Sequence, residues 1–381
     1  MKINYFSAAS IAVFVLNPLL SIIVLLSDKR ANIKVIWFVL SLFMALMAYN
    51  QMPDLTMDIS RYYIKYQEML NMGYLEVWSE NEFNLFILSY IKTLQYLNLN
   101  QEFISFFCVF ISYYLSFLSL QNIKIEESKK LGVGITICLF LSIPFLASAS
   151  GLRNGLASAI CLYTLSSLNQ RGKVSSFALL ALASVVHSYI ILVVLIYSIS
   201  SFRKYYRLFK YAFILSPVFV VIDISFLLPL FNDYFDNVKL YQYVAEGHLE
   251  TEVESKGGMA MLGRFLFSFA PIYVSYLYLL IKKWDDNSFL FIISILGVFS
   301  MLFWQFGVIS GRYLSLLGYL TTFYFLSNYN AHNKNFARLF LLLFAFSNFL
   351  NLFWELYRFR EVYLLDLSFI IKPMFFTILM Y

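Results

Sequence analysis

Apolar runs of about 20 residues recur along the whole of this 381-residue chain, and they restrict its fold more than any other feature. A helix rises ~1.5 Å per residue, so such a run is long enough to cross the ~30 Å hydrocarbon core of a bilayer. Hydrophobic residues make up 61% of the chain and charged residues only 13%, whereas soluble domains carry about 25% charged residues. The sequence therefore predicts a polytopic, all-α integral membrane protein.

The apolar runs lie approximately at 7–26, 33–50, 83–97, 103–120, 131–149, 154–169, 174–200, 209–230, 265–281, 288–306, 312–327, 336–353 and 364–381. Run 83–97 contains Lys92, and run 174–200 is short for the two crossings that its flanking loops require. We expect about 11–14 transmembrane helices, with short re-entrant or peripheral helices at the outer face. The whole chain, 1–381, is predicted to form a single transmembrane domain.

Loop charge predicts the side that each connection faces, because short cytoplasmic loops collect Lys and Arg. Six connections are basic or balanced, at 27–34, 121–131, 169–175, 201–210, 282–287 and 328–338. Two longer stretches, 50–82 and 232–263, are acidic, and each contains six acidic and two basic residues. We therefore place these two stretches at the outer face. The turn of run 174–200, near His187, would then also face outward.

With this orientation the unusual polar residues gather at outer-face helix ends. They are Asp58, Arg61, Glu80, Glu82, Arg153, His187, Arg264 and Arg312. A transporter is expected to place its ionisable residues near the midplane of spanning helices. A layer on one side instead favours binding or chemistry at the outer leaflet.

Asp58, Tyr62 and Tyr66 are spaced i, i+4, i+8 and would share one face of a helix. A carboxylate beside two phenols offers an acceptor and donors that suit the hydroxyls of a sugar. The alternative is an amphipathic surface helix, with its tyrosines anchored at the membrane interface and Asp58 as its N-cap.

Arg153 lies in a stretch of small residues, 148–158, between two apolar runs. A buried arginine in a membrane is costly and needs a partner, and its planar fork of donors suits phosphate or carboxylate. Gly151 and Gly155 allow a helix or a ligand to approach closely. Although a snorkelling arginine with close helix packing is the alternative, we favour an anion site.

The remaining candidates are single residues at predicted helix ends. Glu80 and Glu82 precede an apolar helix, where the helix dipole alone favours carboxylates. His187 is a lone histidine in an apolar run, which is usually structural, although the predicted turn would open it to the outer face. Arg264 and Arg312 could complement a diphosphate, and helix-end anchoring explains each equally well. The spacing of histidines and cysteines predicts no metal site.

These motifs, in this order, resemble those of the EpsG-like branch of the Wzy polysaccharide polymerases. The similar features are Asp-x3-Tyr-x3-Tyr at 58–66, Glu-x-x-Phe-x-Leu at 80–85, Leu-Arg-Asn-Gly-Leu-Ala at 152–157, and the apolar run broken by His187-Ser188. Asn154 stands where the family often has Gln, and Asn81 where it often has Pro. The resemblance covers the first half of the chain, and the second half is similar only in its general plan.

The resemblance implies a metal-independent glycosyltransferase of the bacterial inner membrane that polymerises O-antigen, capsule or exopolysaccharide repeat units. A glycan on undecaprenyl diphosphate would be the donor, a sugar hydroxyl of a newly flipped lipid-linked unit the acceptor, and undecaprenyl diphosphate the leaving group. It implies no cofactor and no nucleic acid, with a chain-length regulator and a flippase of the same pathway as partners.

The residues take their roles from this reaction. The diphosphate ligands would be Arg153 first, then Arg312 and Arg264, with Arg61, Tyr62 and Tyr66 as further substrate contacts. Asp58, Glu82 and His187 are alternatives for the general base that deprotonates the acceptor. Other functions stay open at this point: a flippase for the lipid-linked unit, an O-antigen ligase, or a membrane acyltransferase that decorates the glycan.

Overall fold

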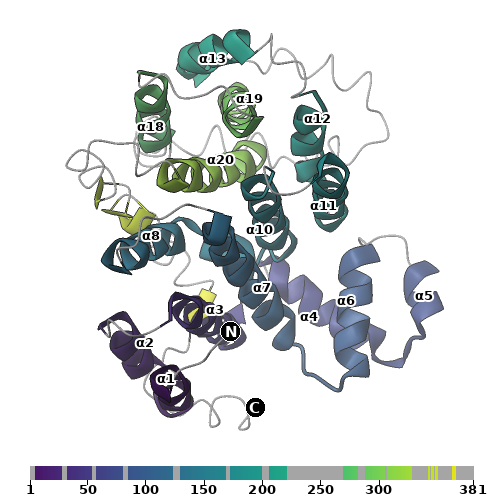
Figure 1. Cartoon of the computed structure of the whole chain (residues 1–381). Coiled ribbons are helices and arrows are strands. Elements are labelled where there is room, and N and C mark those ends of the chain that lie inside the picture. Colours follow the sequence, from purple (N-terminus) through teal and green to yellow (C-terminus); the bar gives the residue numbers. More distant parts are fainter. Residues whose placement is uncertain are drawn as a thin grey trace. The chain divides into compact units, whose positions relative to one another are not determined.

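The computed structural model of the chain describes residues 5–27, 32–53, 57–79, 85–122, 129–168, 172–199, 206–220, 269–281, 288–304, 307–327, 342–343, 345–346, 348–350 and 363–365. These residues are almost entirely helical, as the apolar runs predict (Figure 1). They fall into two compact units, the first formed by residues 1–191 and 348–381 and the second by residues 192–347.

Four helices form the core of the first unit: α3 (Ile33–Tyr49), α7 (Phe103–Ser119), α10 (Arg153–Ser166) and α11 (Lys173–Val186). Helix α7 packs between α3 and α10, and α11 packs on α10. The helical hairpin of α1 (Tyr5–Leu16) and α2 (Pro18–Ser27) lies against α3. Asn17 separates the two helices of this hairpin. Its side chain accepts a hydrogen bond from the Leu20 amide, and Pro18 takes the first position of α2.

The core helices of the first unit run in the directions that loop charge predicts. The C-terminal end of α3 meets the N-terminal end of α7, where Asn100 Nδ2 donates to the Tyr49 hydroxyl at 3.0 Å. At the opposite end, which we call the Ser166 end, Asn122 Nδ2 donates to Ser166 Oγ at 2.9 Å. Helices α7 and α10 are therefore parallel, and α3 is antiparallel to both. The basic connections 121–131 and 169–175 follow the Ser166 end.

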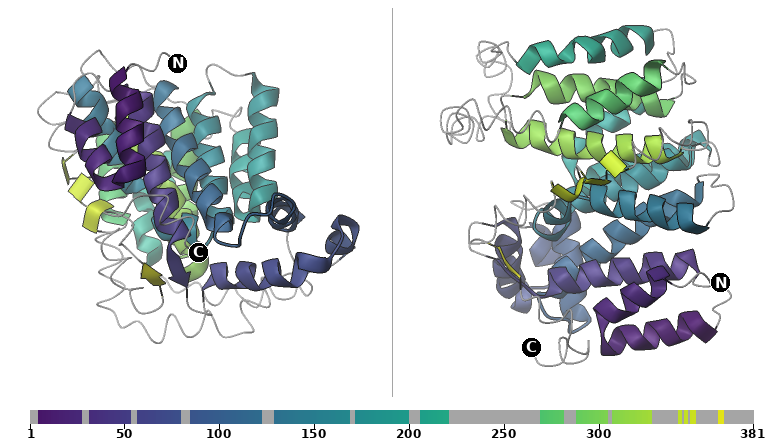
Figure 2. Two further views of the ribbon diagram at one scale, coloured as in Figure 1. Left: turned by 90° about the horizontal axis from the view of Figure 1, so that it is seen from below. Right: turned by 90° about the vertical axis from the view of Figure 1, so that its left-hand side faces the viewer.

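The acidic stretch 50–82 begins at the other end of this bundle, which we call the α4 end. Helix α4 (Asp58–Glu68), the 3₁₀ turn η1 (Met69–Asn71), α5 (Tyr74–Ser79) and α6 (Leu85–Tyr96) lie across the direction of α3 and α7 (Figure 2, left). The 12 residues of α6 span only about 18 Å, too little for a bilayer core. The prediction that run 83–97 does not fully cross stays a prediction, which this length supports. Lys92 Nζ donates to the Met69 carbonyl at 2.9 Å.

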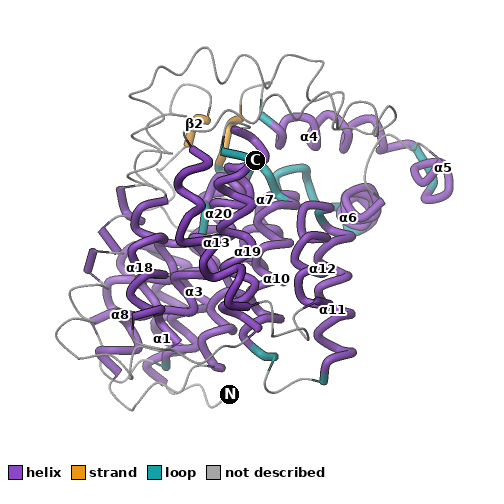
Figure 3. The backbone as a smooth tube through the Cα atoms, turned by 90° about the horizontal axis from the view of Figure 1, so that it is seen from above, coloured by secondary structure: helices purple, strands orange, loops and turns teal. Residues whose placement is uncertain are grey.

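A two-stranded antiparallel ladder interrupts the helical pattern at the α4 end (Figure 3). Strand β1 (Gln51–Pro53) pairs with β2 (Tyr363–Leu365), with Gln51 opposite Leu365. Apolar run 364–381 predicts a helix at Leu364 and Leu365, and this is wrong at these two residues. The run is apolar from its first residue, so hydropathy alone cannot separate a short strand from the helix predicted after it. Residues 366–381 lie outside the described residues.

One helix among the described residues is both long enough and apolar enough to cross a membrane. The segment Phe103–Asn122, formed by α7 and the turn η2 (Leu120–Asn122), has 20 residues and is apolar enough to span. Six shorter apolar helices accompany it: Pro18–Ser27, Ile33–Tyr49, Gly132–Ser142, Lys173–Val186, Ser188–Ser198 and Phe289–Leu302. The number of 11–14 crossings and the single transmembrane domain stay predictions.

The second unit is built from α13 (Tyr206–Leu215) with η5 (Ser216–Val220), α18 (Ala270–Ile281), α19 (Ser288–Leu302) and α20 (Gly307–Ser327), and most of α12 (Ile191–Ile199) also belongs to it. Helix α19 packs against α13 and α20, and α18 packs against α20. The Phe213 ring fills the space over Gly297, where a Cβ atom would lie 1.8 Å from the ring. The glycine lets α13 approach α19 closely.

Candidate functional site

Arg153 is positioned by a sharp corner between two helices of the first unit. Helix α8 (Lys129–Ser142) ends before Pro144, and the five-residue α9 (Phe145–Ala149) leads into the turn at 150–152. Helix α10 then begins at Arg153 itself. At Gly155 a Cβ atom would lie 2.4 Å from Ser148 Cα and 2.3 Å from Ser148 Oγ. The predicted close approach of a helix at Gly155 is therefore confirmed, and the helix that packs there is α9.

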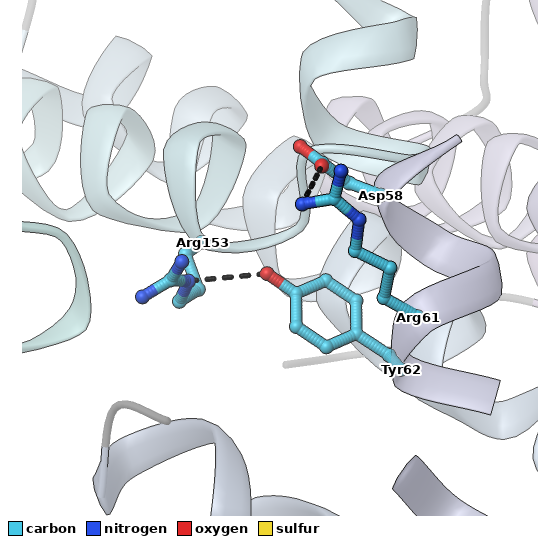
Figure 4. Close-up of polar contacts among 4 residues, drawn as sticks. All are labelled: Asp58, Arg61, Tyr62 and Arg153. Carbon is cyan, nitrogen blue, oxygen red and sulfur yellow. Dashed lines mark hydrogen bonds and ion pairs between the residues drawn. The ribbon is translucent and has the colours of Figure 1, made fainter. Parts of the chain in front are cut away.

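The side chain of Arg153 is bound by a phenol from α4. Its Nε donates a hydrogen bond of 3.1 Å to the hydroxyl of Tyr62, which is only 5% exposed (Figure 4). Burial raises the pKa of Tyr62, although the Arg153 charge acts in the opposite direction. The phenol therefore stays protonated and neutral at ordinary pH. Within the described part of the chain, no carboxylate pairs with Arg153, and its Nη atoms make no hydrogen bond.

Asp58 and Arg61 lie on the first turn of α4, close to Tyr62 (Figure 4). Their ion pair is 3.9 Å long, and the side chains are 53% and 69% exposed, respectively. Such an exposed pair is weak and easily rearranged, so both groups are accessible to a ligand. The alternative role of Asp58 as N-cap is wrong, because Met57 occupies that position and no side chain caps the helix.

Tyr66 fixes α4 in place. Its hydroxyl donates to the Leu99 carbonyl at 2.6 Å, and its own carbonyl accepts from Gln95 Nε2 at 2.6 Å. Tyr62 and Tyr66 are both buried, as expected for one face of a helix, whereas Asp58 is exposed. The alternative in which both tyrosines anchor at the membrane interface does not fit their burial against protein.

His187 ends α11 in an extended conformation, and a 3₁₀ turn, η3 (Ser188–Ile190), follows. The predicted break in run 174–200 is therefore confirmed at this residue. The Tyr189 amide donates to His187 Nδ1 at 3.4 Å. Because this donor needs the lone pair of Nδ1, the neutral ring carries its proton on Nε2 and presents a donor there.

Tyr189 connects the His187 turn to α10. Its ring packs edge-to-face with the imidazole at 4.9 Å, and its hydroxyl is hydrogen-bonded to Ser158 and to the Asn154 carbonyl. These contacts lie in the first two turns of α10, next to Arg153. The α4 end of the first unit thus holds Asp58, Arg61, Tyr62, Arg153 and His187.

Comparison with known proteins identifies the family from nearly the whole chain. A model described as the EpsG family matches residues 34–373. This chain belongs to the EpsG family. Neither the curated proteins nor the solved structures gave a match. Family membership and the helical fold together make this a membrane protein of polysaccharide biosynthesis with a polymerase-like role.

The structure describes only some of the remaining candidate residues of this EpsG-family protein. Glu82, Arg264 and stretch 232–263 lie outside the described residues. Arg312 belongs to the second unit, where α20 begins at Gly307, more than one turn earlier. It therefore lies near the N-terminal end of α20, in its second turn, and apolar run 312–327 omits the first turn of the helix. No metal-binding cluster of His, Cys, Asp or Glu occurs among the residues that the structure describes.

Two contacts that organise the EpsG-family site have no signature in the sequence. Tyr62 and Arg153 are 91 positions apart, and Ser158 and Tyr189 are 31 apart. Both Tyr62 and Arg153 are candidates by residue type, yet no spacing rule predicts that they meet. Tyr189 could have been noticed only as the aromatic residue nearest to His187.

Proposed function

We propose that this protein joins oligosaccharide repeat units carried on undecaprenyl diphosphate at the outer leaflet of the bacterial inner membrane. The observation that supports this most is the Arg153 guanidinium, which is paired with a neutral phenol at the α4 end of the first unit. Among the described residues, no carboxylate forms an ion pair with Arg153. An anionic ligand would therefore neutralise its charge. A diphosphate is the anion that this pathway supplies.

In the proposed reaction, the hydroxyl oxygen of the acceptor sugar forms a bond to the anomeric carbon of the donor glycan. The bond from that carbon to the diphosphate oxygen breaks, and undecaprenyl diphosphate leaves with the electron pair. Arg153 stabilises the charge that develops on the diphosphate through charge-assisted hydrogen bonds. The N-terminus of α10, where Arg153 lies, adds its partial positive charge.

The hydroxyl proton passes to a general base near the α4 end. Asp58 is exposed there and only weakly paired with Arg61, so it is our first choice, and Glu82 is the alternative. His187 suits hydrogen-bond donation better, because its Nδ1 accepts from the backbone. Arg61 is proposed to contact substrate, and the roles of Arg312 and Arg264 as further diphosphate ligands stay predictions from the sequence.

Deletion of the gene distinguishes this polymerase from its rivals. We expect cells without the protein to accumulate a single repeat unit on the lipid anchor or on its final acceptor, as seen by gel analysis of the glycan. A flippase deletion would instead abolish the surface glycan. Deletion of a ligase would leave long polymer on undecaprenyl diphosphate, and loss of an acyltransferase would change only the decoration of a normal polymer. Any of these three patterns would contradict the proposal.

Thiol labelling tests the proposed outward orientation of the α4 end. In a background without Cys108, Cys138 and Cys161, all of which are buried, one cysteine is introduced at exposed Asn71 or at exposed Gly172. A membrane-impermeant reagent should label Asn71→Cys in intact cells. Gly172→Cys, beyond the Ser166 end, should be labelled only after permeabilisation. The reverse pattern would overturn the orientation.

A further inference from the structure

The way in which Tyr62 holds Arg153 leaves one particular edge of the guanidinium available. The bond to Tyr62 uses Nε, at 3.1 Å. Because the guanidinium is planar and its donors are fixed in a fork, the edge formed by the two Nη atoms is left unused by Tyr62. That edge presents two parallel N–H groups, which is the geometry that a phosphate binds in a bidentate manner.

The phenol suits this task better than a carboxylate would. A carboxylate at the same position would also bind Nε, but it would neutralise the guanidinium and reduce its attraction for a diphosphate. Asp58 is nearby, yet within the described residues it pairs with Arg61 and not with Arg153. Burial favours the neutral form of the Tyr62 phenol, so the hydrogen bond fixes the direction of Arg153 without cancelling its charge.

Tyr62 itself is rigidly placed. It is almost fully buried on α4, and α4 is fixed one turn later by the Tyr66 bond to the Leu99 carbonyl. The base of Arg153 is fixed as well, because Gly155 allows α10 to pack closely on α9. Both ends of the contact are therefore held by protein packing before any substrate arrives.

We propose that Tyr62 is a positioning residue: its hydroxyl accepts the Arg153 Nε–H hydrogen bond and so directs the two Nη groups at the diphosphate of the lipid-linked substrate. This inference rests on the proposed function and adds to it a residue that acts through Arg153. It also revises the role expected of Tyr62 from the sequence, which was direct contact with sugar hydroxyls.

Binding of undecaprenyl diphosphate tests the inference, because this product is the same whatever the sugar. The affinity is measured for the purified protein in lipid nanodiscs. We expect Tyr62→Phe to weaken binding roughly tenfold, because the ligand must then immobilise the Arg153 side chain that Tyr62 no longer holds. The matched control is Tyr49→Phe on α3, which removes another buried phenol that accepts an N–H hydrogen bond, from Asn100 Nδ2 at 3.0 Å, and should leave the affinity unchanged.

A double-mutant cycle separates positioning from direct contact. In an Arg153→Ala background, Tyr62→Phe should have no further effect on the affinity, since there is no guanidinium left to direct. An equal loss in both backgrounds would overturn the inference, because Tyr62 would then act on the ligand or on the fold. So would a Tyr62→Phe protein with wild-type affinity beside an Arg153→Ala protein that binds weakly. An Arg153→Ala protein with wild-type affinity would instead refute the proposed diphosphate site itself.

Discussion

Replacement of Arg153 by alanine should abolish polymerisation while leaving the protein in the membrane at near-normal abundance. The departing diphosphate needs fixed cationic donors whose bonds tighten as charge develops, and loss of one such donor typically costs at least about a hundredfold in rate. In the sequence, Arg153 is the only basic residue between Lys130 and Arg171. Arg153→Lys keeps the charge but loses the two-donor edge, so it should retain only a small fraction of activity.

Polymer length and membrane abundance must be measured on the same cultures to interpret these variants. If Arg153 only fills space between helices, Arg153→Ala should lower abundance, and the protein that remains should make normal polymer. Arg61→Ala is the matched control for charge, since Arg61 is an exposed arginine beside the same phenol. It should have a much smaller effect. A stable Arg153→Ala protein that makes full-length polymer would rule out the diphosphate role.

The second large effect is expected at Gly155, and it concerns stability rather than chemistry. A methyl group there would lie 2.4 Å from Ser148 Cα and 2.7 Å from Ser148 Cβ, so α9 would have to move away from α10. Overpacking of this kind typically costs about 1–3 kcal/mol. We expect Gly155→Ala to lower both the thermal midpoint of the purified protein and its abundance in the membrane.

Gly134→Ala is the control for Gly155→Ala. It adds the same methyl group to a helix, α8, at a position with nothing within 4 Å, and it should be neutral or slightly stabilising. Combining Gly155→Ala with Ser148→Gly removes the contacts to Ser148 Cβ and Oγ and should restore part of the lost stability. Equal thermal midpoints for Gly155→Ala and Gly134→Ala would contradict the packing described at this corner.

Much of the first unit could be predicted from the sequence, because two simple physical signals control it. Hydropathy marks the helices, and polar residues mark their breaks, as at His187. Loop charge predicts the directions of α3, α7, α10 and α11, since the basic connections fall at one end of the bundle and the acidic stretch at the other. These signals are local and need no knowledge of which helices touch.

Contacts between distant segments could not be predicted in this way. The sequence indicates that Arg153 needs a partner, but a neutral phenol on α4 satisfies it instead of a carboxylate. Lys92 in apolar run 83–97 predicts only that this helix does not fully cross, whereas the structure shows that its Nζ binds the Met69 carbonyl at the start of η1. In both cases the partner is fixed by helix packing, which periodicity does not encode.

The pairing of β1 with β2 has a consequence for the order in which this protein is completed during synthesis. Gln51–Pro53 leaves the ribosome more than 300 residues before Tyr363–Leu365. At about 5–20 residues per second, the first strand waits for its partner for on the order of 15–60 s. For that time the segment that leads into α4 lacks its ladder hydrogen bonds, although α3, α7 and α10 have already been made. The ladder at the α4 end is therefore completed long after the core helices of the first unit, and a chain that stops short of Tyr363 never forms it.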